Sequence, residues 1–164
     1  MSTHAEPDLD GARSRLAEVV ELATGNVADG GGPFAAMVVR GDEVVATGVN
    51  RVTRDLDPTA HAEVVAIRAA CTALGTHVLR STVLVSSCEP CPLCLSAALW
   101  ARVDGVVYAA DRHDAARGGF DDLAFYELFD RPRQDWELPV RQEQVVGATG
   151  PFEAWLATAD RVEY

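Results

Sequence analysis

Two short segments of the sequence carry metal-ligating side chains at spacings that suit a single zinc site. Cys91 and Cys94 are three residues apart, which on a helix places both sulfur atoms on one face. Pro92 favours a helix start there, and the dipole at a helix start lowers thiol pKa values. His61 would add a third ligand from another predicted helix. A His-Cys-Cys set leaves the fourth zinc position to water, as catalytic sites do.

Glu63 follows His61 by two residues and is interpreted as the proton carrier of this site. It is too close to His61 to ligate the metal from the same helical face, but its carboxylate can reach a water molecule held there. Zinc lowers the pKa of such a water to roughly 7. A carboxylate that takes this proton and delivers protons to a ring nitrogen and a departing amine is what hydrolytic deamination of a heterocycle requires. H-x-E together with P-C-x-x-C is the signature described for zinc deaminases.

Other interpretations of the cysteines stay open at this point. A Cys-x-x-Cys pair is also typical of redox-active folds, although these lack an upstream H-x-E helix. An iron–sulfur cluster would need a further cysteine about four residues after Cys94, where Ala98 stands. Cys88 is able to supply a fourth ligand and turn the site into a closed, structural zinc site. Cys71 is most simply a small core residue.

Hydrophobic periodicity and turn residues predict the elements that position these segments. We expect helices over 8–26, 59–74, 91–102, 121–130 and 151–160, and strands over 34–40, 44–49, 81–87, 105–110 and 140–146. Residues 50–58 are expected to form a polar loop. The central order strand, helix, strand, helix, strand is typical of a three-layer α/β domain. The metal-ligating residues then lie at the starts of two neighbouring helices.

Composition narrows the classes of function further. The 164 residues are 48% hydrophobic, which suits one globular domain, and the formal net charge is −11. An acidic surface repels polyanions, so nucleic acid is not expected as a partner, and a tRNA-editing deaminase is improbable. No apolar run approaches the roughly 18 residues of a membrane span, and the polar start is unlike a signal peptide. We expect a cytoplasmic protein with reduced cysteines and no membrane partner.

Three motifs give the chain a resemblance to a known family. These are DPTAHAEVVAIRAAC over 57–71, SCEPCPLCLSAA over 87–98 and GGFDDL over 118–123. The first two resemble the cytidine deaminase-like superfamily. The third, with PFEAW from Pro151 and the final Glu163-Tyr164, is similar to the small bacterial guanine deaminases.

The resemblance implies a fold, a reaction and a set of site residues. The implied fold is a three-layer α/β/α cytidine deaminase-like domain over 1–164, with a central mixed sheet of about five strands. The implied reaction is zinc-dependent hydrolysis of guanine to xanthine and ammonia, with one Zn²⁺ per chain. The implied zinc ligands are His61, Cys91 and Cys94, the catalytic residues are Glu63 and Asp122, and the substrate-binding residues are Asn50, Phe34, Trp100 and Tyr164.

Several of these residues could instead have a purely structural role. Asp122 is equally suited to cap a helix, and Asn50 to form a turn. Phe34 and Trp100 are apolar enough for the core, and core packing is the preferred interpretation of Trp100.

The resemblance also implies an assembly and leaves two rival functions. The segment from about 150 to 164 is expected to be exchanged between the protomers of a homodimer, which brings Tyr164 over the partner's site. One rival function is deamination of another aminated ring, such as cytosine, guanosine, cytidine, a modified guanine or an aminotriazine. A rival from a different class is a non-enzymatic, zinc-stabilised binding module.

Overall fold

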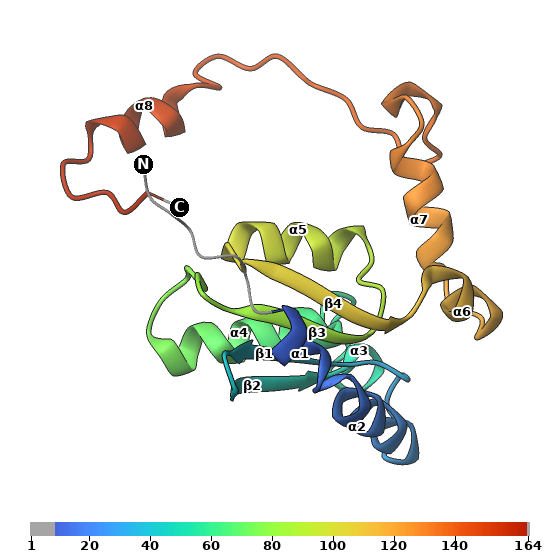
Figure 1. Cartoon of the computed structure of the whole chain (residues 1–164). Helices are drawn as coiled ribbons and strands as arrows, with labels where there is room; N and C mark the ends of the chain where they lie inside the picture. The colour runs from blue at the N-terminus through green and yellow to red at the C-terminus, as the bar shows by residue number, and fades with distance from the viewer. Residues whose placement is uncertain (1–8, 164) are drawn as a thin grey trace. The chain divides into compact units, whose positions relative to one another are not determined.

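A mixed four-stranded sheet with the order β2-β1-β3-β4 forms the centre of the fold (Figure 1). The computed structural model describes residues 9–163. The strands are β1 (Ala35–Arg40), β2 (Glu43–Val49), β3 (Val83–Cys88) and β4 (Gly105–Ala110). β1 pairs antiparallel with β2 and with β3, whereas β3 and β4 are parallel. A parallel pair needs a crossover, which α5 (Pro92–Ala101) provides.

Helices cover both faces of this sheet. The side chains of β1 point alternately to the two faces, so they pack into two separate cores. Ala36 and Val38 pack into the core under α4 (Ala62–Leu74) and α5, while Met37 belongs to the core under the N-terminal helices. Those helices are α1 (Leu9–Arg13) and α2 (Leu16–Ala28). The arrangement confirms the three-layer α/β/α prediction.

The remaining elements are short. They are α3 (Val52–Asp55), α6 (Arg112–Arg117), α7 (Asp122–Phe129), the 3₁₀ helix η1 (Arg133–Asp135) and α8 (Gly150–Ala157). The chain divides into two compact units, 1–126 and 127–164, so that α7 crosses the boundary in sequence. Within residues 9–163 no helix has the length and apolar character that a membrane span requires.

One predicted helix is divided in two, one predicted strand is wrong, and one loop contains a helix. The predicted helix over 8–26 is broken at Ser14, whose hydroxyl and backbone N–H both donate to the carbonyl of Gly11. The predicted strand over 140–146 is irregular, because the second unit contributes no strand to pair with it among residues 127–163. The polar loop over 50–58 contains the single turn α3.

Close approach between α4 and β2 fixes the position of the site. A Cβ atom on Gly48 would lie 2.3 Å from the carbonyl oxygen of Ala62 and 2.4 Å from the backbone nitrogen of Ala66. Only glycine therefore allows the first turns of α4 to lie this close to β2. His61 immediately precedes these turns, so the glycine determines where the imidazole is placed.

Candidate active site

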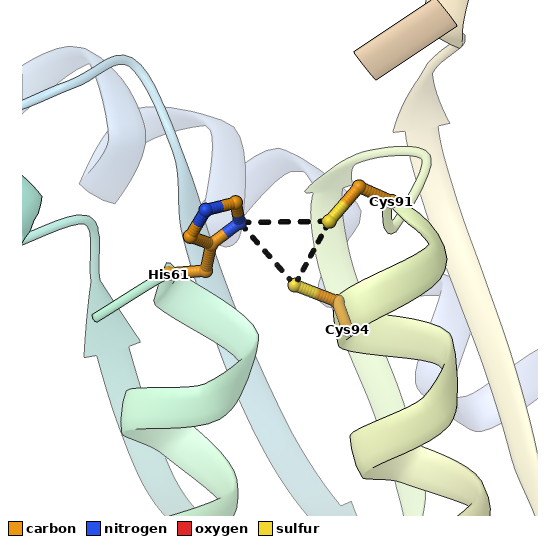
Figure 2. Close-up of side chains that lie close together, drawn as sticks. All are labelled: His61, Cys91 and Cys94. Carbon is orange, nitrogen blue, oxygen red and sulfur yellow. Dashed lines mark hydrogen bonds between the residues drawn. The ribbon is translucent and has the colours of Figure 1, made fainter. Parts of the chain in front are cut away.

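The predicted metal ligands lie at the N-caps of two neighbouring helices (Figure 2). His61 is the N-cap of α4 and Cys91 is the N-cap of α5, and both have extended backbone conformations. Neither side chain caps its own helix. Both are therefore available for a metal, and both helices direct the positive ends of their dipoles toward the ligands.

Three donor atoms converge at this point, in agreement with the predicted spacing. His61 Nδ1 lies 3.6 Å from Cys91 Sγ and 3.5 Å from Cys94 Sγ, and the two sulfur atoms are 3.6 Å apart. Figure 2 shows the imidazole facing both sulfurs. Within residues 9–163 these three side chains form a compact group of possible metal ligands. Two sulfurs and one imidazole nitrogen are a donor set that zinc prefers, so the residues fit the ion.

The two thiols influence each other strongly. The hydrogen bond between them lowers the pKa of Cys91 to about 4 and raises the pKa of Cys94. The hydrogen bond with Cys91 likewise raises the pKa of His61. Cys91 therefore ionises first, and a thiolate is the form in which cysteine binds a metal.

Glu63 is a buried carboxyl group directly beside the metal ligands. Its side chain is 5% exposed. Oε1 accepts a hydrogen bond from the Ser86 hydroxyl at 2.9 Å, and Oε2 lies 3.3 Å from Cys94 Sγ. Burial raises the pKa of Glu63 above its usual range. A carboxyl group with a raised pKa holds a proton more readily than an exposed one, which suits a proton carrier.

A cavity of about 270 Å³ lies in front of this group. Its walls include the predicted site residues Phe34, Asn50, His61, Glu63, Cys91 and Asp122. Phe34 packs edge-on against Phe120, with ring centroids 4.7 Å apart, to form an apolar wall. An apolar wall with a few converging polar groups is typical of a site for a small molecule.

Asp122 is the first residue of α7, and its side chain borders the cavity. Burial, followed by the nearby Cys91, raises the pKa of this carboxyl group. A second carboxyl group with a raised pKa thus borders the same cavity as Glu63.

One residue assigned to substrate binding, Trp100, is not part of the cavity lining. Trp100 is 61% exposed, so the preferred interpretation as a core residue is wrong. On α5 the buried positions are Cys94, Ala98 and Ala101, and Trp100 falls on the opposite side of the helix, outside the cavity lining. Tyr164 lies outside the described residues.

The structure also distinguishes between the alternatives for the other cysteines. Cys88 Sγ points toward the carbonyl of Asp111 at 3.6 Å and is not part of the ligand group among the described residues. The site therefore has three protein ligands rather than four, which favours an open site over a structural one. Cys71 packs against the core under α4 as expected.

Several residues that border the site were not singled out from the sequence. Glu89 lines the cavity and is held by three hydrogen bonds from Arg112. Arg112 also lies over the ring of Tyr126, whose hydroxyl donates to the carbonyl of Pro90. The available signal was the Asp111-x-x-Asp114 capping box that starts α6, which places Arg112 at the first helical position.

Comparisons with known proteins agree with this geometry. Residues 12–110 match the sequence model of the cytidine and deoxycytidylate deaminase zinc-binding region. The chain is 46% identical to guanine deaminase from Bacillus subtilis, over 91% of this chain and 96% of that protein. The X-ray structure of Bacillus subtilis guanine deaminase superposes with a TM-score of 0.89, covering 93% of this chain and 98% of the other. A structure of guanine deaminase from Nitrosomonas europaea is 34% identical, with a TM-score of 0.65, over 74% of this chain and 76% of the other.

Proposed function

Because this chain belongs to the cytidine and deoxycytidylate deaminase family, we propose that it is a zinc-dependent enzyme that hydrolyses guanine to xanthine and ammonia. The observation that carries the proposal is the convergence of His61, Cys91 and Cys94 with the buried Glu63 at one cavity. The likeness to guanine deaminases over nearly the whole chain supports guanine as the ring.

His61, Cys91 and Cys94 hold one Zn²⁺ per chain in this proposal. When bound, zinc would act as a Lewis acid and lower the pKa of a water molecule at the site to about 7. The remaining chemistry is carried by side chains of the chain itself.

Glu63 moves the protons of the reaction. The hydrogen bond from the Ser86 hydroxyl and the contact with Cys94 hold the carboxyl group at the cavity, and burial raises its pKa. It takes a proton from the attacking water and delivers protons to a ring nitrogen and to the amino group that leaves from C2. Burial makes this efficient, because bulk water does not compete for the carried proton.

Asp122, Asn50 and Phe34 bind and orient the base. The carboxyl group of Asp122 faces the cavity and assists proton transfer to the departing amine. Asn50 hydrogen-bonds the polar edge of the purine. Phe34, braced by Phe120, contacts the ring and excludes water.

An ammonia-release assay decides between the candidate rings. Zinc-loaded protein is offered guanine, guanosine, cytosine, cytidine, adenine and an aminotriazine, with Glu63→Ala as the control for contaminating activity. We expect turnover of guanine that depends on Glu63. Turnover of another ring alone would keep the chemistry but remove the assignment of Asn50 and Asp122 as guanine readers. No ammonia from any ring would favour the non-enzymatic binding module.

The assembly and location belong to the same proposal. We expect a homodimer in which residues from about 150 to 164 reach the partner's site, with Tyr164 near the substrate. α8 in this segment leaves Phe152 70% exposed and Leu156 66% exposed, and such apolar side chains favour contact with another surface. A cytoplasmic location suits the free cysteines and the thiolate chemistry, since thiols stay reduced there.

A further inference from the structure

The chain contains only two asparagines, and the structure connects them. The side-chain nitrogen of Asn26 donates to the backbone carbonyl of Asn50 at 2.9 Å. It also donates to the carbonyl of Gly32 at 2.8 Å. A side-chain amide nitrogen has two hydrogens, so both donors are used. Asn26 itself is 4% exposed, near the end of α2.

The two acceptors belong to different walls of the cavity. Gly32 lies just before Phe34, and the backbone N–H of Phe34 also donates to the Gly32 carbonyl at 2.8 Å. The backbone N–H of Asn50 donates to the carbonyl of Phe34 at 3.0 Å. Asn26 therefore joins the loop that presents Phe34 to the loop that presents Asn50.

The glycines of this loop are required by the same arrangement. A Cβ on Gly31 would lie 2.3 Å from the side-chain nitrogen of Asn26. A Cβ on Gly32 would lie 2.9 Å from Oδ1 and 3.0 Å from Cγ of Asn50. The loop thus passes against the amides of both asparagines, and only residues without a side chain fit there.

We infer that Asn26 is a positioning residue for substrate specificity. It does not line the cavity itself. It holds the backbone of Asn50 in place. The side chain of Asn50 is held as well, because its Oδ1 accepts a hydrogen bond from the backbone N–H of Val52 at 3.3 Å. The amide is thereby presented to the purine in a fixed position. The inference rests on the proposed function, because it takes Asn50 as the residue that reads the base.

Asn26→Asp tests the inference in the zinc-loaded enzyme. The carboxylate keeps the shape of the side chain but has no hydrogens for the two carbonyls, so the Asn50 loop loses its support. We expect KM for guanine to rise about tenfold, in line with the loss of a buried hydrogen bond or two. We expect kcat within about twofold of the wild type and an unchanged zinc content, since neither Glu63 nor the ligands contact Asn26. Unchanged KM in the folded variant would overturn the inference.

Two further variants separate positioning from general loss of stability. Gly32→Ala pushes the Asn50 amide from the opposite side and should raise KM in the same way. Val19→Ala removes a buried contact on the same helix and should lower the melting temperature without changing KM. If Val19→Ala raised KM as much as Asn26→Asp, the effect of Asn26 on KM would come from general stability, and the inference would be wrong.

A third variant serves as the matched control. Gly25→Ala, one residue before Asn26, places its Cβ in open space and should leave both kinetic constants unchanged.

Nuclear magnetic resonance measures the connection without any turnover. Selective ¹⁵N-asparagine labelling yields signals from Asn26 and Asn50 alone, and Asn26→Asp leaves only those of Asn50. We expect the Asn50 signals to shift in the ligand-free variant and to respond less to 8-azaguanine. Asn50 signals that match the wild type would refute positioning. If the wild-type enzyme is inert toward guanine, the proposed function fails, while the ligand-free spectra still decide the role of Asn26.

Discussion

Glu63 combines features that are rarely found together in a carboxyl group. It is almost completely buried, it receives a hydrogen bond from Ser86, and it lies beside Cys94 at the floor of a cavity. Burial of a carboxyl group costs free energy of folding, because the charged form loses its hydration. The proposed role in proton transfer gives this costly position a function.

Replacing Glu63 by glutamine should abolish most of the activity without loss of the fold. The glutamine amide would keep an acceptor for Ser86 but could not carry a proton, so we expect kcat to fall by about 10²–10⁴-fold. Ammonia release from guanine measures the loss, and the zinc content should stay near one per chain. Glu21→Gln, on the exposed part of α2, is the matched control. Activity within tenfold of the wild type would point to Asp122 as the principal proton carrier.

At the scale of elements, the site depends on where α4, α5 and α6 begin. The starts of α4 and α5 could be located from the sequence, because His61 and the Pro90-Cys91-Pro92 run mark them. Spacing pairs only Cys91 with Cys94, and His61 could be added because H-x-E together with P-C-x-x-C matches a known zinc signature. The irregular conformation over 140–146 could not be predicted, because a strand requires a partner and local alternation does not reveal one. The exposure of Trp100 was missed for a related reason, since which side of an apolar helix faces the sheet depends on tertiary packing.

The contact between β2 and α4 gives a prediction of its own. In Gly48→Ala the new methyl group meets backbone atoms of Ala62 and Ala66, which cannot move aside without shifting the helix. We expect a loss of roughly 1–3 kcal/mol in the free energy of unfolding, together with weaker zinc binding because His61 moves with the helix. Thermal unfolding and zinc competition measure the two effects. An unchanged melting temperature would show that α4 is not held by this approach.

Asp111 makes the start of α6 sensitive to pH. Its side chain accepts hydrogen bonds from the backbone N–H groups of His113 and Asp114, and these lower the pKa of Asp111 in the folded protein. A lowered pKa stabilises the fold at pH values above the unfolded pKa of about 3.9. That contribution disappears as the pH falls through the lowered value.

Asp111→Asn isolates this effect, because asparagine still accepts the capping hydrogen bonds but does not titrate. The difference in melting temperature between the wild type and the variant should favour the wild type near pH 6 and shrink toward zero below about pH 4. Measuring the difference at each pH cancels the titration of the metal ligands, which both proteins share. A difference that does not change with pH would contradict the assignment.

At the scale of the whole molecule, the two compact units differ in character. The unit over 1–126 contains the sheet, both cores and the cavity, whereas the described part of the unit over 127–164 has no buried side chain. A segment with this little burial gains stability from a surface outside itself. In the proposed homodimer, the partner chain would supply such a surface.

Mixed dimers test whether the segment from about 150 serves the partner's site. A chain truncated after Thr149 lacks the segment, and the full-length Glu63→Gln chain lacks the proton carrier. Each should be inactive alone. If the segment is exchanged, co-expression pairs an intact Glu63 with a segment from the partner, and about one site per mixed dimer should regain activity. Ammonia release from purified mixed dimers, separated by two affinity tags, provides the readout; a complete lack of complementation would place the segment over its own site.

The metal ligands and part of the cavity wall come from different segments of the chain, and this separation affects how the enzyme can evolve. The donor atoms lie at the starts of α4 and α5, while part of the wall comes from the connecting segments that present Phe34, Asn50 and Phe120. Mutations in those segments reshape the space offered to a ring without displacing the reactive groups. Single substitutions at the wall can therefore change which ring fits while the enzyme keeps its catalytic groups. A mutant library limited to the wall positions is the place to begin engineering a deaminase with a different substrate preference.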